Sequence, residues 1–380
     1  MNVALVGSTT QSMVEFRGQL IKELTDRHHT VYCYVSDLNK KNEFLIRQIG
    51  AKPVLTDLDR SGLNFFNAAE NVVKLTKDFK KRKISHCLCF FAKPVLIGAL
   101  SARMAGVQNI TLMLEGMGVN FTKPREGLNI KRSIMKRFQL LMYTFVFQFA
   151  TRIVVLNLDD ARELNLGTFS LYQDKTILLD GIGVDLQHFR YADFPKLESN
   201  LTEVSFIFIG RLLRDKGIYD FIEAATSIKK TSPRAIFRVV GDTDSGNPSS
   251  LTSKQVECIA SSGVVDFFGF QSDVFKWIAS SDVLVLPSYR EGFPKVVMES
   301  CAIGRPAIVA DVPGSRSAVI DGVNGFLYHP GDVSSLEFVM RKFLNDPMLA
   351  NRMSMDCRSL AERRFDGEEK ARELANIVFS

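Results

Sequence analysis

The stretch V-L-V-L-P-S-Y-R-E-G-F-P-K-V-V-M-E-S, residues 283–300, indicates most directly how the chain folds. Its first four residues are apolar without alternation, which is typical of a parallel strand buried on both faces. A loop follows, and Pro294 suits the first position of a helix because the N–H that proline lacks has no partner there. The stretch therefore predicts a strand, a loop and a helix whose free N–H groups favour an anion.

The same alternation of apolar runs and helix-like stretches recurs along the whole chain, so we predict an α/β fold with two Rossmann-like, doubly wound domains. Helix-like stretches include 14–27 and 63–79. The predicted strands are residues 3–6, 30–35, 86–91, 109–114, 153–156, 204–209, 236–240, 264–268, 283–286, 307–309 and 325–328. Ligands of such sheets bind beyond the carboxyl ends of the strands. We therefore expect the two domains to face a central cleft.

A polar, proline-containing segment at 191–203 predicts a linker. It would separate an N-terminal domain at 1–190 from a C-terminal domain at 204–362, with a final helix at 363–380.

Composition and charge narrow the function classes. The 380 residues are 46% hydrophobic and 24% charged, which is ordinary for a globular protein. The six cysteines are scattered, which favours a reduced, cytoplasmic interior. Residues 1–190 hold 26 Lys and Arg against 17 Asp and Glu, an excess that would attract anionic lipid, phosphate or nucleic acid. Nucleic acid is disfavoured because no RNP, helix-turn-helix or zinc-finger pattern is present.

Two glutamates in the quoted stretch suggest carbohydrate chemistry. Glu291 and Glu299 are eight residues apart, or about 12 Å if both were helical. That exceeds the ~5–9.5 Å of a glycosidase carboxylate pair but suits two acceptors for different hydroxyls of one extended ligand. The alternative is a helix that merely begins with charged residues.

A second segment follows the apolar strand at 204–209. Gly210 would let a ligand approach the backbone closely, and Arg211 and Lys216 would place two cations at the start of the next helix. This arrangement favours a diphosphate clamp over its alternative, a solvated basic turn. Together the two segments predict a nucleotide-sugar site. We expect this site to work without a metal ion, because the sequence offers no cluster of metal ligands beyond the lone Asp57-Leu-Asp59 pair.

At this point the chain resembles glycosyltransferase family 4, the retaining enzymes of GT-B fold. The motifs that carry the resemblance are Gly210-Arg211 with Lys216-Gly217, Glu291 and Glu299 in E-x7-E spacing, Val239-Val-Gly241-Asp242, Gly181-Ile-Gly-Val-Asp185 with Phe189, and Asp321-Gly-Val-Asn-Gly325. The resemblance covers nearly the whole chain and is strongest from Gly181 onward. It implies that the helix at 363–380 packs back onto the N-terminal domain.

The resemblance also implies site roles. Arg211, Lys216 and Glu291 would be catalytic, with the two cations neutralising the donor diphosphate and Glu291 binding the transferred sugar. The donor-binding residues would be Gly210, Arg211, Lys216, Phe268, Phe270, Glu291, Gly292, Phe293, Pro294 and Glu299. Among them Phe268 and Phe270 would line the base, and Glu299 would hold the ribose. The acceptor would attack on the same face of the sugar from which the phosphate leaves. The less favoured alternative is a glutamate nucleophile that first forms a covalent bond to the sugar.

The first half resembles the branch that acts on polyprenyl-diphosphate-linked sugars, and within it the bacterial N-acetylgalactosaminyltransferases. Asp57-Leu-Asp-Arg60-Ser-Gly-Leu-Asn64 belongs to this likeness, and the implied acceptor-binding residues are Phe16, Arg17, Lys93, Glu115, Gly116 and Gly118. Many family members have a histidine near Glu115, and its absence here argues against a histidine-based mechanism. Glu115 either binds donor or acceptor hydroxyls or caps a loop.

The implied reaction is transfer of N-acetylgalactosamine, or another N-acetylhexosamine, from UDP in α linkage to a polyprenyl-diphosphate-linked saccharide in O-antigen, capsule or glycoprotein glycan assembly. The alternatives are a glucosyl-, galactosyl- or mannosyltransferase and a non-catalytic sugar-nucleotide-binding protein. A nicotinamide-dependent oxidoreductase is disfavoured because no strand is followed by G-x-G-x-x-G.

The stretch 121–149 is the best candidate for contact with lipid. Basic residues crowd its first half, and its second half is strongly apolar but shorter than the ~18 residues needed to span a bilayer. We expect Lys131, Arg132, Lys136 and Arg137 to contact an anionic membrane, which would place the protein in the cytoplasm, peripherally at the inner face of the cytoplasmic membrane. The alternative is a core helix flanked by a solvated loop.

Overall fold

The computed structural model describes residues 1–58, 65–122, 130–167, 170–194, 203–244, 246–247 and 249–380. These residues form two compact units. The first unit contains Met1–Phe121, residues 130–182 and Gly367–Ser380, and the second contains Gly183–Asp366. In the described ranges, no helix has both the length and the apolar character needed to cross a membrane.

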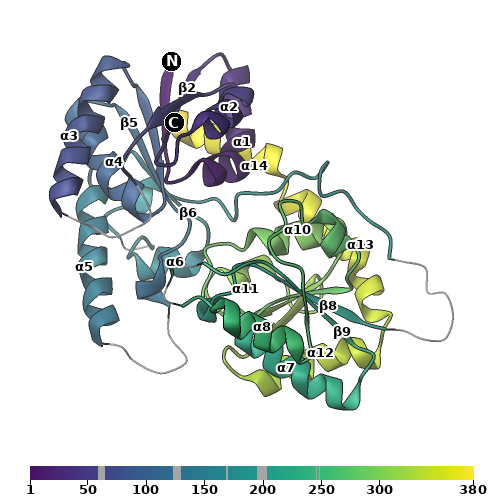
Figure 1. Ribbon diagram of the computed structural model, residues 1–380. Coiled ribbons are helices and arrows are strands. Elements are labelled where there is room, and N and C mark those ends of the chain that lie inside the picture. The colour runs from purple at the N-terminus through teal and green to yellow at the C-terminus, as the bar shows by residue number, and fades with distance from the viewer. Residues whose placement is uncertain (59–64, 123–129, 168–169, 195–202, 245, 248) are drawn as a thin grey trace. The chain divides into compact units, whose positions relative to one another are not determined.

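The first unit is built on a seven-stranded parallel sheet in the order β3-β2-β1-β4-β5-β6-β7 (Figure 1). Its strands are β1 (Asn2–Val6), β2 (Thr30–Val35), β3 (Lys52–Leu55), β4 (His86–Phe90), β5 (Asn109–Leu114), β6 (Arg152–Val155) and β7 (Thr176–Leu178). Its helices are α1 (Thr10–Asp26), α2 (Lys40–Gln48), α3 (Phe65–Lys81), α4 (Ala92–Ala105), α5 (Ile130–Phe147), α6 (Leu158–Glu163) and α14 (Gly367–Phe379), with 3-10 turns η1 (Val119–Phe121) and η2 (Gln173–Lys175).

The second unit repeats the plan with a six-stranded parallel sheet in the order β10-β9-β8-β11-β12-β13. Its strands are β8 (Ser205–Ile209), β9 (Ile236–Val240), β10 (Asp266–Phe267), β11 (Val283–Leu286), β12 (Ala307–Ala310) and β13 (Gly325–Tyr328). Its helices are α7 (Ile218–Thr231), α8 (Ser253–Ser261), α9 (Phe275–Ala279), α10 (Lys295–Ile303), α11 (Ser315–Ala318), α12 (Val333–Asn345) and α13 (Leu349–Arg364), with the 3-10 turn η3 (Arg214–Lys216). Helix α7 packs beside α12, and α10 packs beside α13.

These two sheets confirm the predicted α/β class with two doubly wound, Rossmann-like domains. Two short edge strands, β3 and β7, were not predicted from the sequence. Both are partly exposed, and β3 contains Lys52 and Pro53. An edge strand is buried on fewer sides, so it lacks the unbroken apolar run that identifies the central strands.

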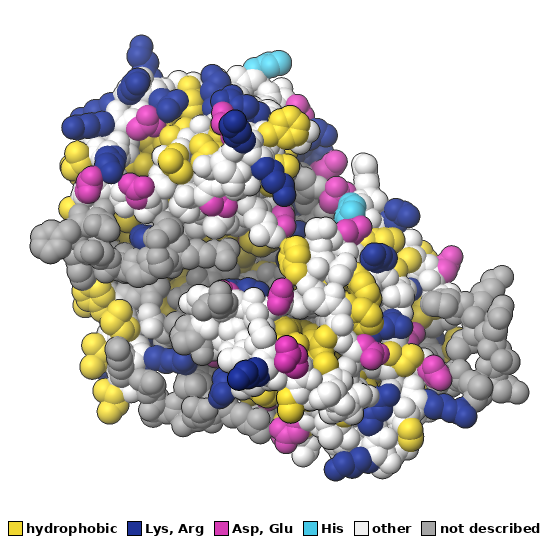
Figure 2. Space-filling view, viewed as in Figure 1, with side chains coloured by type: hydrophobic (Ala, Val, Ile, Leu, Met, Phe, Trp, Pro, Cys, Tyr) yellow, Lys and Arg dark blue, Asp and Glu magenta, His cyan; other side chains and the backbone are white. Residues whose placement is uncertain are grey.

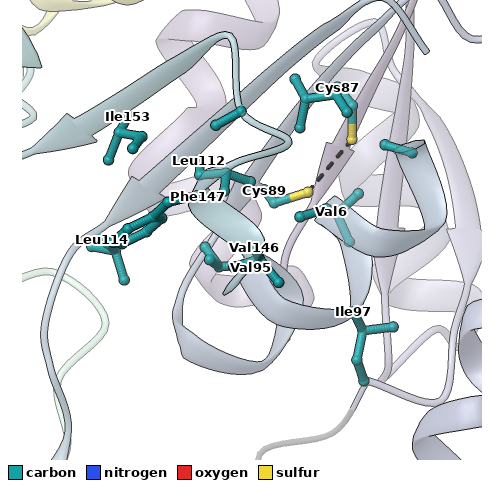
Figure 3. Close-up of a cluster of buried hydrophobic side chains, with 14 of the residues drawn as sticks. Val6, Cys87, Cys89, Val95, Ile97, Leu112, Leu114, Val146, Phe147 and Ile153 are labelled. Atoms are coloured by element: carbon teal, nitrogen blue, oxygen red, sulfur yellow. Dashed lines mark hydrogen bonds between the residues drawn. The ribbon is translucent and has the colours of Figure 1, made fainter. Parts of the chain in front are cut away.

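The core of the first unit lies between the sheet and its helices (Figure 3). Cys87 and Cys89 of β4 are both fully buried in it, and their Sγ atoms lie 3.5 Å from each other. Close packing also fixes a glycine: a Cβ on Gly98 of α4 would lie 2.4 Å from the Cys89 Sγ. These thiols therefore fill space between strand and helix, and burial raises the pKa of Cys89 well above its ordinary value.

The chain passes between the units earlier than predicted. The second unit begins at Gly183, whereas the sequence placed the first domain's end at residue 190 and a linker at 191–203. Ala192 is part of the second unit's packing: its N–H donates to the Ile303 carbonyl at 3.1 Å, and its carbonyl accepts from Arg305 Nη1 at 2.7 Å. Composition alone identified these residues as polar but could not show which of them pair with the second unit.

The last helix belongs to the first unit. Helix α14 packs against α1, and Arg27 Nη1 donates to Asn376 Oδ1 at 2.9 Å. Lys370 Nζ donates to the Leu179 carbonyl at 2.7 Å. The chain thus returns to its first unit after completing the second.

Candidate functional site

The predicted donor residues lie at the carboxyl edge of the second unit's sheet, where the strand order changes direction. After β8 the chain proceeds to β9 on one side, whereas β11 pairs with β8 on the other. This is the position at which doubly wound sheets bind ligands. Gly210, Arg211 and Lys216 follow β8, and Glu291 follows β11, so they flank this position from both sides.

The loop after β11 is held on its β8 side by backbone contacts. The Tyr289 N–H donates to the Asp215 carbonyl at 3.0 Å. Gly217 has a φ of 73° and ends the turn η3, and a Cβ there would lie 2.1 Å from the Pro287 carbonyl oxygen. Only glycine permits both the left-handed conformation and the close approach. The loop that carries Lys216 is therefore packed directly on the loop that carries Glu291.

The same loop is held on its β12 side. The Glu291 N–H donates to the Pro313 carbonyl at 3.1 Å. Gly314 has a φ of 79°, and a Cβ there would lie 2.2 Å from the Glu291 carbonyl oxygen. Gly314 was not predicted from the sequence, although the Pro313-Gly314 pair, which begins four residues after the end of a predicted strand, is a turn signal.

Lys216 and Glu291, both predicted as catalytic, form an ion pair. Lys216 Nζ lies 2.5 Å from Glu291 Oε1, and the side chains are 25% and 12% exposed. The pair joins the loops after β8 and β11 across the point where the strand order reverses. Most of the pair is buried, but part of each side chain is exposed, so a charged ligand can reach both groups.

Arg211, the other predicted cation, also has a carboxylate partner. Its Nη1 lies 2.7 Å from Oδ2 of Asp244 in the loop after β9, and both side chains are substantially exposed. No role was predicted for Asp244. Its position in the loop after a predicted strand, two residues after Asp242, could have indicated that it lies at the same edge of the sheet as Arg211.

The E-x7-E stretch places its second glutamate on a helix. Pro294 was predicted to be the first residue of this helix, but it is the N-cap residue of α10, one position earlier. Glu299 is 6% exposed, and its Oε1 lies 3.2 Å from Nζ of Lys295, one turn earlier. Phe293 is buried against Phe365 at a ring distance of 5.8 Å, so its backbone rather than its ring is the part that a ligand could meet.

Glycines bring the neighbouring loops together. A Cβ on Gly241 would lie 1.9 Å from the Gly210 carbonyl oxygen, and the Gly241 N–H donates to the Gly269 carbonyl at 2.9 Å. The aromatic residues on either side of Gly269 differ in exposure: Phe268 is 36% exposed and contacts Trp277, and Phe270 is 62% exposed. The loops after β8, β9 and β10 therefore meet at one edge, with the predicted base-lining residues beside them.

In the first unit the predicted acceptor residues Arg17 and Glu115 form a buried ion pair, with side chains 1% and 5% exposed. Arg17 Nη1 also donates to the Phe16 carbonyl at 2.7 Å, and its guanidinium lies 4.6 Å from the Phe90 ring centre. Burial lowers the pKa of Arg17 to about 9, which leaves it charged at neutral pH. The structure shows the Arg17 side chain enclosed and neutralising Glu115, and its predicted contact with an acceptor stays a prediction.

The remaining predicted acceptor residues lie at the same edge of this sheet. Phe16 packs on Phe91 at a ring distance of 6.4 Å. Lys93 is in the first turn of α4, directly after β4, and Gly116 and Gly118 follow Glu115 after β5. The stretch Asp57–Asn64 falls mostly outside the described residues.

The four predicted membrane contacts on α5 differ in their surroundings. Lys136 is paired with Glu163 and lies 5.2 Å from the Phe121 ring centre, and 34% of its side chain is exposed. Arg132 is half-buried and Arg137 is exposed, whereas the side chain of Lys131 lies outside the described residues. The membrane contact of these residues stays a prediction.

No three His, Cys, Asp or Glu side chains gather as a metal site within the part of the chain that the structure describes. Asp57 is instead 3.2 Å from Lys74 Nζ.

Comparisons with known proteins show what the chain is similar to. Residues 189–359 match the family model of glycosyl transferases group 1. The chain is 27% identical over 358 residues to the N,N'-diacetylbacillosaminyl-diphospho-undecaprenol alpha-1,3-N-acetylgalactosaminyltransferase of Campylobacter jejuni, covering 92% of this chain and 91% of that protein. It is 28% identical over 316 residues to the UDP-Gal:alpha-D-GlcNAc-diphosphoundecaprenol alpha-1,3-galactosyltransferase of Escherichia coli, covering 81% and 78%.

Solved structures share the fold over the whole chain. HepE of Anabaena, in complex with UDP and glucose, superposes with a TM-score of 0.77 at 18% identity and covers 100% of both chains. Sucrose-phosphate synthase of Thermosynechococcus elongatus gives a TM-score of 0.79 at 18% identity, covering 99% of this chain and 98% of that one. Both likenesses concern the fold.

Proposed function

Residues 189–359 form a group 1 glycosyltransferase domain, the chain is a hexosyltransferase, and from this premise we propose its reaction. It transfers N-acetylgalactosamine, or another N-acetylhexosamine, from a UDP-sugar to a polyprenyl-diphosphate-linked saccharide, in α linkage and with retention. The relative of Campylobacter jejuni, which matches over 92% of this chain, supports the sugar and the lipid-linked acceptor. The complex of HepE with UDP supports a uridine diphosphate donor.

The observation that carries the proposal is the Lys216–Glu291 ion pair at 2.5 Å where the strand order reverses. In the proposed reaction the donor's anomeric C–O bond breaks, and its electrons pass to the diphosphate. Lys216 and Arg211 stabilise that charge electrostatically, assisted by backbone N–H groups near Gly292 and Phe293. Glu291 accepts hydrogen bonds from the transferred sugar, Glu299 from the ribose.

The acceptor hydroxyl forms the new bond on the same face and gives its proton to an oxygen of the departing phosphate. Because the cations are side chains of the protein, the proposal needs no resident metal. On the acceptor side, Glu115 receives a hydroxyl hydrogen bond, and Arg17 keeps its carboxylate charged and fixed.

A galactosyltransferase is the second candidate, because the Escherichia coli relative transfers galactose and matches 81% of this chain. The two candidates differ only in the group that the donor site accepts at C2 of the sugar, an N-acetyl group or a hydroxyl. A site built to hydrogen-bond one of these groups rejects the other, because its own polar groups are then left buried without a partner.

The test is a panel of UDP-N-acetylgalactosamine, UDP-N-acetylglucosamine, UDP-galactose, UDP-glucose and GDP-mannose, each offered with an undecaprenyl-diphosphate-linked saccharide. Product mass identifies the sugar, and linkage analysis identifies the anomer. We expect the highest kcat/KM with a UDP-N-acetylhexosamine and an α product. A β product, or transfer from GDP-mannose alone, would contradict the proposal, and binding without transfer or hydrolysis would indicate a non-catalytic protein.

We also propose that α5 contacts the inner face of the cytoplasmic membrane. Its exposed large apolar residues are Ile130, Ile134, Met135, Leu141 and Phe145. Four of them follow one another at intervals of four, seven and four residues, which places them on one face of the helix. Apolar side chains gather over this part of the first unit (Figure 2). Exposed Arg137 shares the face, so apolar insertion rather than the four basic residues would supply most of the contact.

Vesicle flotation tests this contact. We expect wild-type protein to float with vesicles that contain anionic lipid, and Ile134→Asp with Leu141→Asp to remain at the bottom. Phe338→Asp is the matched control, because Phe338 is equally exposed at 67% but lies on α12 of the second unit. Flotation that the double variant leaves unchanged would contradict the role of α5.

A further inference from the structure

Each of the two proposed donor cations already has a carboxylate partner, but only one of these carboxylates has a role in the proposed reaction. Glu291, the partner of Lys216, is placed to bind the sugar. Asp244, the partner of Arg211 at 2.7 Å, has no such role. A carboxylate is a simple mimic of phosphate for a guanidinium, since both offer oxygens to its N–H fork.

Asp244 is mounted on a loop that is fixed to the loop of Arg211. The Leu212 N–H donates to the Asp242 carbonyl at 3.0 Å, and the Leu251 N–H donates back to the Leu212 carbonyl at 2.9 Å. Leu213 and Ser250 form an antiparallel bridge, and Ser250 Oγ accepts the N–H of Asp244 at 2.8 Å. Asp244 is therefore held opposite Arg211 by the backbone and does not arrive there by chance rotation of a free side chain.

The pair is nevertheless easy to open. Arg211 is 51% exposed and Asp244 is 32% exposed. Ion pairs in such surroundings contribute little to stability because water screens both charges. A diphosphate carries more charge than a carboxylate and can engage the guanidinium with two oxygens, so it displaces Asp244 from Arg211. Once displaced, Asp244 remains close to the diphosphate and repels it.

We propose that Asp244 competes with the diphosphate for Arg211, and thereby weakens the binding of UDP and promotes its release after transfer. The inference rests on the proposed function, because it takes the ligand to be a nucleoside diphosphate. Asp244 is a counter-charge in the donor site and takes no part in bond breaking. Its effect falls on UDP affinity and on inhibition by the UDP product.

Asp242 provides a matched control on the same loop. Its Oδ1 accepts the N–H of the next residue, Thr243, at 2.7 Å, and within the described residues its carboxylate forms no ion pair with Arg211. Asp242→Asn and Asp244→Asn remove the same charge from nearly the same place. The difference between them isolates the contact with Arg211 from the general change in charge.

The experiment is titration calorimetry of UDP into full-length wild type, Asp244→Asn, Asp242→Asn, Arg211→Met and the double variant Arg211→Met with Asp244→Asn. We expect Asp244→Asn to bind UDP about 3- to 10-fold more tightly, with a matching fall in the inhibition constant of UDP, because tenfold corresponds to only ~1.4 kcal/mol. Asp242→Asn should change the affinity less than twofold. In the Arg211→Met background, Asp244→Asn should give no such gain.

Unchanged or weaker UDP binding by Asp244→Asn, with wild type binding normally, would overturn the inference: it would mean that Asp244 orients Arg211 for the donor rather than competing for it. An equal gain in Asp242→Asn would overturn it as well, since the effect would then be general electrostatics. UDP binding by none of the proteins would instead overturn the proposed function, and this inference with it.

Discussion

The two units share one strand order but carry charge differently at the carboxyl edges of their sheets. In the second unit, the pairs Lys216–Glu291 and Arg211–Asp244 each leave part of their surface to solvent. In the first unit, Arg17 and Glu115 are enclosed, with side chains 1% and 5% exposed. The same scaffold thus supports an edge whose ion pairs can exchange partners and an edge whose ion pair cannot.

The difference follows from the cost of separating charges. An exposed pair can open because water solvates both groups, so a charged ligand can replace one partner. Opening a buried pair leaves an uncompensated charge in a medium of low dielectric constant, which is strongly unfavourable. The second unit is therefore suited to bind an anionic donor, and the first to hold a carboxylate at a fixed position for neutral hydroxyls.

The largest effect is expected from breaking the buried pair. Arg17→Met should lower the free energy of unfolding by about 3–5 kcal/mol, because Glu115 would remain buried without a counter-charge. The measurement is urea denaturation followed by circular dichroism. Arg17→Lys keeps the charge, so it should be less destabilised than Arg17→Met. It should still be less stable than wild type, because it loses the guanidinium fork that also contacts the Phe16 carbonyl.

A double variant separates this cause from loss of packing. Arg17→Met combined with Glu115→Gln removes both charges and should recover much of the stability lost in Arg17→Met alone. If the double variant folds but binds the lipid-linked acceptor with a raised KM, Glu115 acts on the acceptor side. An Arg17→Met protein as stable as wild type would contradict the account of the first unit's edge.

The next effect concerns the Lys216–Glu291 pair, and it should appear in activity more than in stability. Lys216→Ala and Glu291→Ala should each reduce kcat by about 10²- to 10³-fold, the range found when one group that stabilises developing charge is removed. Their loss of stability should be smaller than that of Arg17→Met, because water reaches part of this pair, whose side chains are 25% and 12% exposed. Lys230→Ala, an exposed lysine on α7 of the same unit, is the control and should retain full turnover. Near wild-type turnover in Lys216→Ala would remove the basis of the donor site.

The sequence was sufficient for those features that depend on one segment at a time. Central strands such as β1 and β11 are buried on both faces, so an unbroken apolar run identifies them. The position of Lys216 and Glu291 at one edge could be predicted, because each lies in the loop that follows such a strand and the carboxyl ends of parallel strands share one edge of a sheet.

Features that depend on two distant segments could not be predicted. Asp244 meets Arg211 only because loops from two strands are joined by backbone hydrogen bonds. The burial of Arg17 was also hidden, since an arginine in the middle of a helix is usually exposed and its partner lies at the end of another strand. The pairing of Lys136 with Glu163 was hidden for the same reason, because Glu163 belongs to a different helix.

The smallest expected effect is a sensitivity to acid that belongs to the first unit. Phe379 of α14 lies against the rings of His29 and His86, at ring distances of 4.4 and 4.3 Å. His86 Nε2 lies 2.8 Å from the Asn109 amide nitrogen, a donor, so this ring is neutral in the folded protein. Burial lowers the pKa of both histidines below the ordinary value of about 6.5.

The unfolded chain therefore binds more protons than the folded one below about pH 6.5, so stability falls as the pH falls from about 6.5 toward the lower folded-state pKa values and levels off below them. Wild type should therefore lose stability from this source between about pH 7.5 and about pH 5.5. His86→Gln, which keeps an acceptor near Asn109 but does not titrate, should lose less than wild type. His28→Gln should behave as wild type, because His28 is exposed. Equal acid sensitivity in wild type and His86→Gln would show that the packing of α14 on the rest of its unit does not depend on the charge of His86.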